Sequence, residues 1–185
     1  MNPMFPTIVV VVAAIVAVFI VIVALQPPDF TVTRSANITA PPDAVFTQVN
    51  DLHCWKAWSP WEGIDPALNR TYEGPAQGVG SIYRWSGNAK VGAGSMTVTE
   101  SRPNELVRFK IDFLKPFKAT NTAEFTFKSA GRQTQVTWTM SGKYNFVTKA
   151  MKLFMSMDKM IGGQFEKGLA QLNTVAASTK TEARV

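Results

Sequence analysis

Histidine and cysteine are almost absent from this sequence: among 185 residues, His53 is the only histidine and Cys54 the only cysteine. One cysteine excludes an internal disulfide and fits either side of a membrane. We expect Cys54 to pack as a small apolar side chain rather than to act as a nucleophile. No other ligands stand at metal-binding spacing, so neither a zinc site nor a Ser-His-Asp triad is favoured. We therefore predict no metal and no cofactor.

Two glycine-rich stretches lack the features of a phosphate-binding loop. Residues 74–80 (GPAQGVG) and 87–94 (GNAKVGAG) do not end in Gly-Lys-Ser/Thr, and neither clearly opens a helix. We predict hairpin turns at both places.

Acidic residues are fewer than basic ones, 13 against 19, which gives a net charge of +6. This balance fits attraction to an anionic lipid surface. The basic residues are scattered rather than clustered, however, so the sequence gives little support to nucleic-acid binding.

A long apolar run is the most prominent feature that is present. Residues 7–25 (TIVVVVAAIVAVFIVIVAL) contain no charge, no Gly and no Pro, and as a helix they are long enough to cross a bilayer. A buried core helix is disfavoured because the run is apolar on every side and is bounded by Pro6 and by Pro27 and Pro28. A cleaved signal peptide is the closer alternative. It is disfavoured because no Lys or Arg precedes the run and residues 24–26 (ALQ) form a poor cleavage site.

We therefore predict a retained single-pass membrane anchor over residues 7–25. Flanking charge is nearly absent, so the side of the membrane that holds the rest of the chain is undetermined. Residues 1–28 form the anchor and a Pro-Pro linker, residues 29–177 form one domain, and the polar residues 178–185 form a tail that is expected to fray.

Hydrophobic periodicity predicts an α+β domain. A strand near residues 30–38 precedes two short helices, near residues 42–49 and 51–61. Alternating apolar and polar residues then predict the hairpins of an antiparallel sheet. These strands cover residues 81–86, 95–101, 106–113, 119–128 and 134–141, with a weaker one at 69–73.

Helical spacing returns over residues 147–176, with an apolar stripe that is expected to cover the sheet. Gly162 and Gly163 interrupt this helix, which suggests a kink or a close approach of another group to the backbone.

Three segments of the chain carry a family resemblance. They are residues 40–46 (APPDAVF), Asn50 and Asp51 with residues 55–61 (WKAWSPW), and residues 165–169 (FEKGL). Together they resemble the SRPBCC superfamily, which includes START-related lipid-transfer domains, polyketide cyclase-like proteins and pathogenesis-related allergens. The first two segments are typical of the polyketide cyclase-like branch. The resemblance covers essentially everything after Pro28.

This resemblance implies a helix-grip fold: a curved antiparallel sheet of about seven strands wrapped around a long C-terminal helix. Members of the superfamily often bind a hydrophobic small molecule in an internal cavity, but the fold does not choose a chemistry. Oxygenase members need a Rieske motif or an iron triad, which one histidine and one cysteine cannot supply.

Aromatic and apolar residues on the predicted inner faces are the candidate ligand contacts. Trp55 and Trp58 fit either an aromatic lip beside the cavity or core packing, with core packing favoured. Tyr83 and Trp85 share an inward strand face, where ligand contact and packing are equally supported. The full predicted set is Trp55, Trp58, Tyr83, Trp85, Phe109, Ile111, Trp138, Met140, Phe154 and Asp158.

Asp158 is the one carboxylate in the middle of the apolar helical stripe. We expect it to be buried, and either paired with an inward-pointing Arg or Lys, hydrogen-bonded to Tyr83 or an indole, or partly protonated. It is also the candidate polar handle for a ligand. Glu100 has the same inward parity as its apolar neighbours and is a weaker candidate acid or base.

Three functions are consistent with these features. The favoured one is a membrane-tethered module that binds a lipid or other hydrophobic small molecule. The second is a cyclase- or dehydratase-type enzyme that uses Asp158 or Glu100 as acid or base. The third is a protein-interaction module with an unknown partner.

Overall fold

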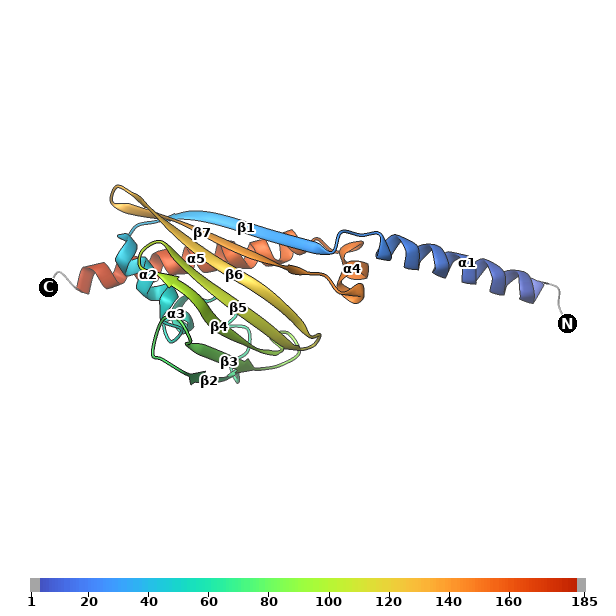
Figure 1. Cartoon of the computed structure of the whole chain (residues 1–185), viewed down its shortest axis with the longest axis horizontal. Coiled ribbons are helices and arrows are strands. Elements are labelled where there is room, and N and C mark those ends of the chain that lie inside the picture. The colour runs from blue at the N-terminus through green and yellow to red at the C-terminus, as the bar shows by residue number, and fades with distance from the viewer. Residues whose placement is uncertain (1–3, 183–185) are drawn as a thin grey trace.

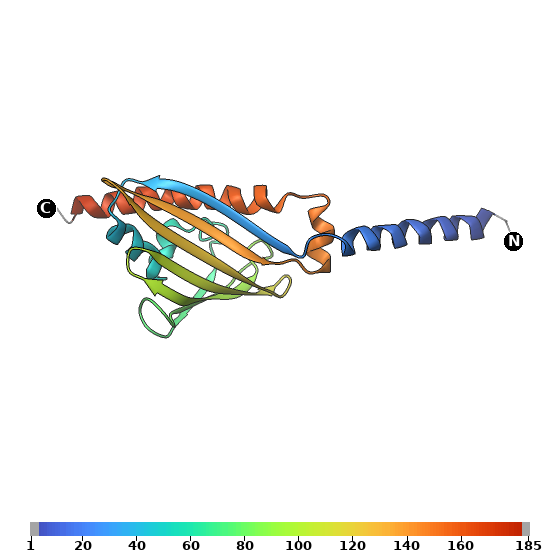
Figure 2. The same cartoon turned by 45° about the horizontal axis from the view of Figure 1, so that its top comes forward.

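The computed structural model describes residues 4–182. Helix α1 (Met4–Ala24) projects from one end of a curved domain (Figures 1 and 2). Only 6% of its apolar stretch is buried against the rest of the chain. A helix of this length and composition near an N-terminus is either a membrane span or a signal sequence.

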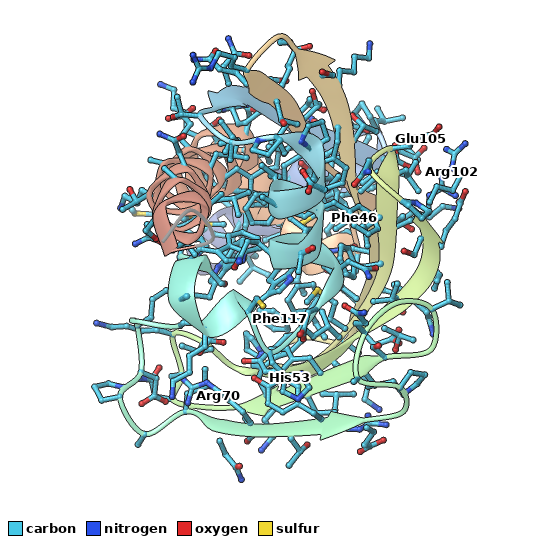
Figure 3. The ribbon with its side chains drawn as sticks, turned by 90° about the vertical axis from the view of Figure 1, so that its left-hand side faces the viewer. Phe46, His53, Arg70, Arg102, Glu105 and Phe117 are labelled. Atoms are coloured by element: carbon cyan, nitrogen blue, oxygen red, sulfur yellow. The ribbon has the colours of Figure 1, made fainter. Side chains whose placement is uncertain are left out.

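Seven antiparallel strands form one sheet in the order β1-β7-β6-β5-β4-β3-β2. Figure 3 shows the sheet curving around the helices. The strands are β1 (Asp29–Ile38), β2 (Asn69–Glu73), β3 (Ile82–Ser86), β4 (Ala93–Arg102), β5 (Leu106–Lys115), β6 (Ala119–Ala130) and β7 (Gln133–Lys143).

Helices α2 (Pro42–Asn50) and α3 (Trp55–Trp58) close the end of the domain farthest from α1 (Figure 1). The long helix α5 (Met157–Glu182) packs along β1 and against both of them. This arrangement confirms the predicted helix-grip fold.

The predicted terminal helix is instead two helices, so that expectation was wrong in one respect. Short α4 (Phe146–Lys152) ends before residues 153–156, and α5 begins after them. Ser156 explains the restart, because its hydroxyl accepts a hydrogen bond from the Lys159 backbone NH at 3.3 Å, as an N-cap residue does. The helix is therefore interrupted before Ser156 and not at the glycine pair, because α5 continues through Gly162 and Gly163.

Candidate functional site

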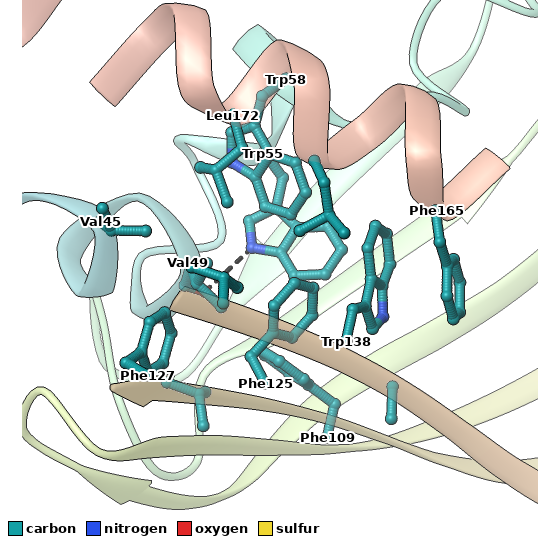
Figure 4. Close-up of a cluster of buried hydrophobic side chains, with 14 of the residues drawn as sticks. Val45, Val49, Trp55, Trp58, Phe109, Phe125, Phe127, Trp138, Phe165 and Leu172 are labelled. Atoms are coloured by element: carbon teal, nitrogen blue, oxygen red, sulfur yellow. Dashed lines mark hydrogen bonds between the residues drawn. The ribbon is translucent and has the colours of Figure 1, made fainter. Parts of the chain in front are cut away.

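Large aromatic side chains fill the space between the sheet and α5 on the side of α2 and α3 (Figure 4). Trp55 packs against Trp58, with ring centroids 4.6 Å apart, and against Phe109 at 5.4 Å. The Trp138 ring stacks on Phe165 of α5 at 4.0 Å. These residues are buried, so packing is sufficient to explain Trp55, Trp58 and Phe109.

Hydrogen bonds fix the two α3 indoles in this cluster. The Trp55 Nε1 donates to the Val49 carbonyl at 2.9 Å, and the Trp58 Nε1 donates to the Gln48 carbonyl at 3.0 Å. Both acceptors lie on α2, so the WKAWSPW segment joins α2 to the core of the domain. This arrangement leaves neither indole NH free for a ligand.

On the other half of the concave face, on the side of α1, several apolar side chains are only half-buried. Strand register places Phe30, Gly142, Asn121, Ile111 and Met96 in one row across β1, β7, β6, β5 and β4. This row is near the start of β1 and the end of β7, where α1 and α4 attach. Its apolar members and their neighbours are buried or half-buried: Phe30, Trp85, Met96, Ile111, Phe113 and Met140.

Two buried polar side-chain atoms of the described residues have no hydrogen-bond partner. Asn121 Oδ1 belongs to this half of the face, and Trp138 Nε1 belongs to the aromatic cluster at the border between the two halves. Asn121 is 8% exposed and Trp138 is 2% exposed. The Asn121 side chain lies over Gly142, where an added Cβ would clash with it. Burying a donor or an acceptor without a partner costs desolvation free energy. A ligand's hydroxyl can donate to Asn121 Oδ1 or accept from Trp138 Nε1, whereas a carboxylate can only accept from Trp138 Nε1.

A second polar group lies beside β2 and β3. Glu62 Oε1 accepts from the Tyr83 hydroxyl at 2.7 Å, and Glu62 Oε2 accepts from Arg70 Nε at 2.5 Å. The Glu62 side chain is only 9% exposed. Burial, reinforced by the bond to Glu62, raises the pKa of Tyr83 well above its usual range. Figure 3 labels Arg70 and His53 on this side of the domain, and the His53 ring stacks on Tyr72 of β2, with ring centroids 4.0 Å apart.

Sequence reasoning missed Glu62. The residue lies in the irregular segment between α3 and β2, where no periodicity indicates a direction for its side chain. The only available signal was the inward Tyr83, whose hydroxyl requires a partner when buried.

Asp158 is not buried, which corrects the prediction: its side chain is 60% exposed. It does pair with an inward-pointing arginine. Arg34 donates to both carboxylate oxygens of Asp158 at 3.0 Å and to Glu166 at 2.7 Å. These bonds hold the pKa of Asp158 below its usual range. Asp158 is exposed because it lies in the first turn of α5, at the open end of the helix.

The close approach predicted at the glycine pair is confirmed at Gly162. A Cβ there would collide with the guanidinium of Arg34, whereas a Cβ at Gly163 would meet nothing within 4 Å. Gly162 therefore leaves the space in which Arg34 spans α5 from Asp158 to Glu166.

The two glycines give a matched prediction. Gly163→Ala is expected to stabilise the domain by about 1 kcal/mol, because alanine is favoured over glycine in a helix by about that amount and a Cβ at this half-buried position meets no neighbouring atom. Gly162→Ala should lose this gain, because Arg34 must leave its two carboxylates. Urea unfolding of both variants checks the order, and equal stabilisation by the two would contradict the proposed role of Gly162.

Two further expectations are corrected. Phe154 does not line the interior: it lies in the segment between α4 and α5 and is 80% exposed. Glu100 does not face inward, because a register shift between Val98 and Glu100 reverses the strand parity. Its carboxylate pairs with Arg108, which also binds Glu124 on β6.

The sequence matches one family model over residues 29–177, described as polyketide cyclase / dehydrase and lipid transport. The chain belongs to this family. No curated protein matches the sequence.

Several solved structures have the same fold as this chain. A protein from Chromobacterium violaceum superposes with a TM-score of 0.58 at 14% identity, over 79% of this chain and 96% of its own. The di-domain ARO/CYC BexL has a TM-score of 0.61 at 15% identity, over 85% of this chain and 53% of BexL. The Aha1 dimer from Colwellia psychrerythraea superposes with a TM-score of 0.52 at 19% identity, over 80% of this chain and 95% of the Aha1 chain. At these identities the likeness concerns the fold.

Proposed function

We propose that the chain is a membrane-tethered domain of this family that binds an apolar molecule with a polar end. The binding face is the α1-side half of the concave sheet. The observation that carries this proposal is the pair of unpartnered polar atoms, Trp138 Nε1 and Asn121 Oδ1, inside a largely apolar interior. Trp138 Nε1 offers a donor and Asn121 Oδ1, four register positions further along the sheet, offers an acceptor. The half-buried Trp85, Ile111 and Phe113 offer contacts to the apolar part of a ligand.

The aromatic cluster restricts where such a ligand fits. Trp55, Trp58, Phe109 and Phe125 occupy the half of the interior next to α2 and α3. A ligand is therefore expected to lie between this cluster and α1 rather than along the full length of α5. With the ligand in this position, Phe154 and Asp158 are no longer expected to contact it. The contacts that remain expected are Trp85, Ile111, Trp138 and Met140.

The binding face can be tested with Trp138→Phe, which keeps a stacking ring on Phe165 and removes the indole donor. We expect the affinity for cis-parinaric acid, an apolar fluorescent fatty acid, to fall roughly three- to tenfold, the value of one hydrogen bond. The free energy of unfolding should change by less than about 1.5 kcal/mol, because no protein hydrogen bond is lost.

Phe127→Leu is the matched control, since Phe127 belongs to the core beside α2. Its ring packs against that of Phe46, with ring centroids 5.7 Å apart. This variant should keep the affinity for the probe. If wild type does not bind cis-parinaric acid, or if Trp138→Phe binds it equally well, the proposed site is wrong.

The tether can be tested separately. Removing residues 1–28 is expected to move the protein from the membrane fraction to the soluble fraction. The domain should stay folded, with the circular dichroism spectrum changed only by the loss of the helical signal of α1. The reason is that α1 buries little of its surface against the domain. Release of the full-length chain by carbonate washing, or a mature N-terminus near Gln26, would contradict a retained anchor.

Acid-base catalysis is the second candidate function. The candidate acid or base is Glu62, because Asp158 is exposed and Glu100 does not face inward. Its buried carboxylate and the Tyr83 hydroxyl it binds share the inner side of β3 with Trp85. The family description includes cyclases and dehydrases. Turnover of a polyketide-like substrate that disappears in Glu62→Gln would favour this function over simple binding.

A further inference from the structure

The end of the domain next to α1 exposes an unusual number of large apolar side chains. They come from the β5-β6 hairpin, from α4, from the segment between α4 and α5, and from the first turn of α5. We name this set the basal surface; it consists of Leu114, Phe117, Phe146, Val147, Met151, Leu153, Phe154, Met155 and Met160.

Helix α4 is the clearest part of the basal surface. None of its seven residues is buried, although Phe146, Val147 and Met151 are apolar. The helix is nevertheless well defined, because the Asn145 side chain caps it by accepting from the Thr148 NH at 2.9 Å. An ordered helix with an uncovered apolar side requires an apolar partner.

Helix α4 also lies directly beside the end of α1 (Figures 1 and 2). Lys149 of α4 donates to the Ala24 carbonyl at 3.4 Å, at the last residue of α1. Where α1 leaves a bilayer, α4 would therefore lie at the depth of the lipid headgroups.

The hairpin between β5 and β6 reaches the same end of the molecule. The register pairs Phe113 with Ala119 at the α1 side of the sheet, and the hairpin tip beyond this pair has the sequence LKPFK, residues 114–118. Phe117 is 46% exposed at this tip.

Lysines surround these apolar side chains. Residues 143–160 contain four lysines and a single acidic residue, Asp158, and the hairpin tip adds Lys115 and Lys118. Apolar side chains with lysines around them are typical of segments that lie in the interface of an anionic membrane. The positive charge of these lysines therefore favours an anionic lipid surface over a second protein as the partner.

We propose that the basal surface docks onto the anionic surface of the same bilayer that α1 spans, with Phe117 and Phe154 inserted among the lipids. This inference rests on the proposed membrane tether and adds an orientation to it. The α1-side half of the concave face then lies next to the bilayer. The apolar molecule it takes would thus be one that resides in that membrane.

The test uses the full-length chain with Cys54→Ser, reconstituted in vesicles of phosphatidylcholine and phosphatidylglycerol. A bimane label is attached to Phe154→Cys or, independently, to Phe117→Cys. The matched control carries the label at Arg132→Cys, in the exposed β6-β7 turn at the end far from α1 (Figure 1). Emission is compared with and without lipids that carry a spin label high on the acyl chain.

We expect the spin-labelled lipid to quench most of the emission at positions 154 and 117 and little at 132, with weaker quenching in vesicles of phosphatidylcholine alone. Vesicle flotation is measured on the same samples. Protein that floats but shows equal quenching at all three positions overturns the docking and leaves the tether intact. Protein that does not float overturns both, and quenching that is independent of phosphatidylglycerol overturns the role of the lysines.

Discussion

Trp58→Ala is expected to lower the free energy of unfolding by about 3 to 5 kcal/mol, the usual cost of removing a fully buried large aromatic side chain. The Trp58 indole contacts Trp55, Phe125 and Trp138, so its removal opens a cavity at the centre of the aromatic cluster. It also removes the hydrogen bond from Trp58 Nε1 to the Gln48 carbonyl, which ties α3 to α2. Urea unfolding followed by circular dichroism measures the loss.

Trp58→Phe is the control for this prediction. It keeps an aromatic ring in the cluster and removes the donor, so we expect a smaller loss, about 1 to 3 kcal/mol. If alanine and phenylalanine cost the same, the stability comes from the hydrogen bond rather than from packing, and the interior is looser than the aromatic contacts indicate.

Glu62→Ala is expected to cost about 2 to 3 kcal/mol, because it leaves the Arg70 guanidinium and the Tyr83 hydroxyl without their acceptor. The figure is below that for a fully buried pair because the Arg70 side chain is 22% exposed. Glu62→Gln keeps an acceptor for one of the two donors and should cost less. Thermal unfolding of both variants tests the order, and an unchanged Glu62→Ala would place Glu62 outside the folded core.

The raised pKa of Tyr83 makes part of the stability depend on pH. Burial favours the neutral phenol, so the folded chain holds this proton to a higher pH than the unfolded chain, where a tyrosine titrates near pH 10. The contribution is therefore complete below about pH 10 and is lost as the pH rises above that value. Tyr83→Phe should show a shallower loss of stability in alkali than wild type.

The sequence predicted the sheet well because strand alternation is local. The inward sides of β5 and β7 follow directly from the spacing of Phe109 and Ile111 and of Trp138 and Met140, and the structure places all four on the concave face. Glu100 shows the limit of this method. A β-bulge between Val98 and Glu100 turns the Glu100 side chain to the outer face, and the alternation of residues gives no signal of this bulge.

Long-range pairing explains the remaining differences. Helical spacing identified Asp158 and the glycine pair as unusual, and Arg34 connects them from a strand 124 residues earlier. The sequence alone contained no means of choosing Arg34 among 19 basic residues. Phe154 belongs to the apolar stripe only if one helix runs without interruption from residue 147 to residue 176. The helix is interrupted at residues 153–156, and α5 starts again at the Ser156 cap.

The most direct test of the account is native mass spectrometry of the full-length chain released from lipid nanodiscs, with organic extraction of the same sample. We predict a single apolar molecule with a polar end bound to each chain, retained by wild type and reduced in Trp138→Phe. Wild-type protein that carries no bound molecule, or carries the same amount as Trp138→Phe, would contradict the binding of an apolar ligand beside Trp138 and Asn121.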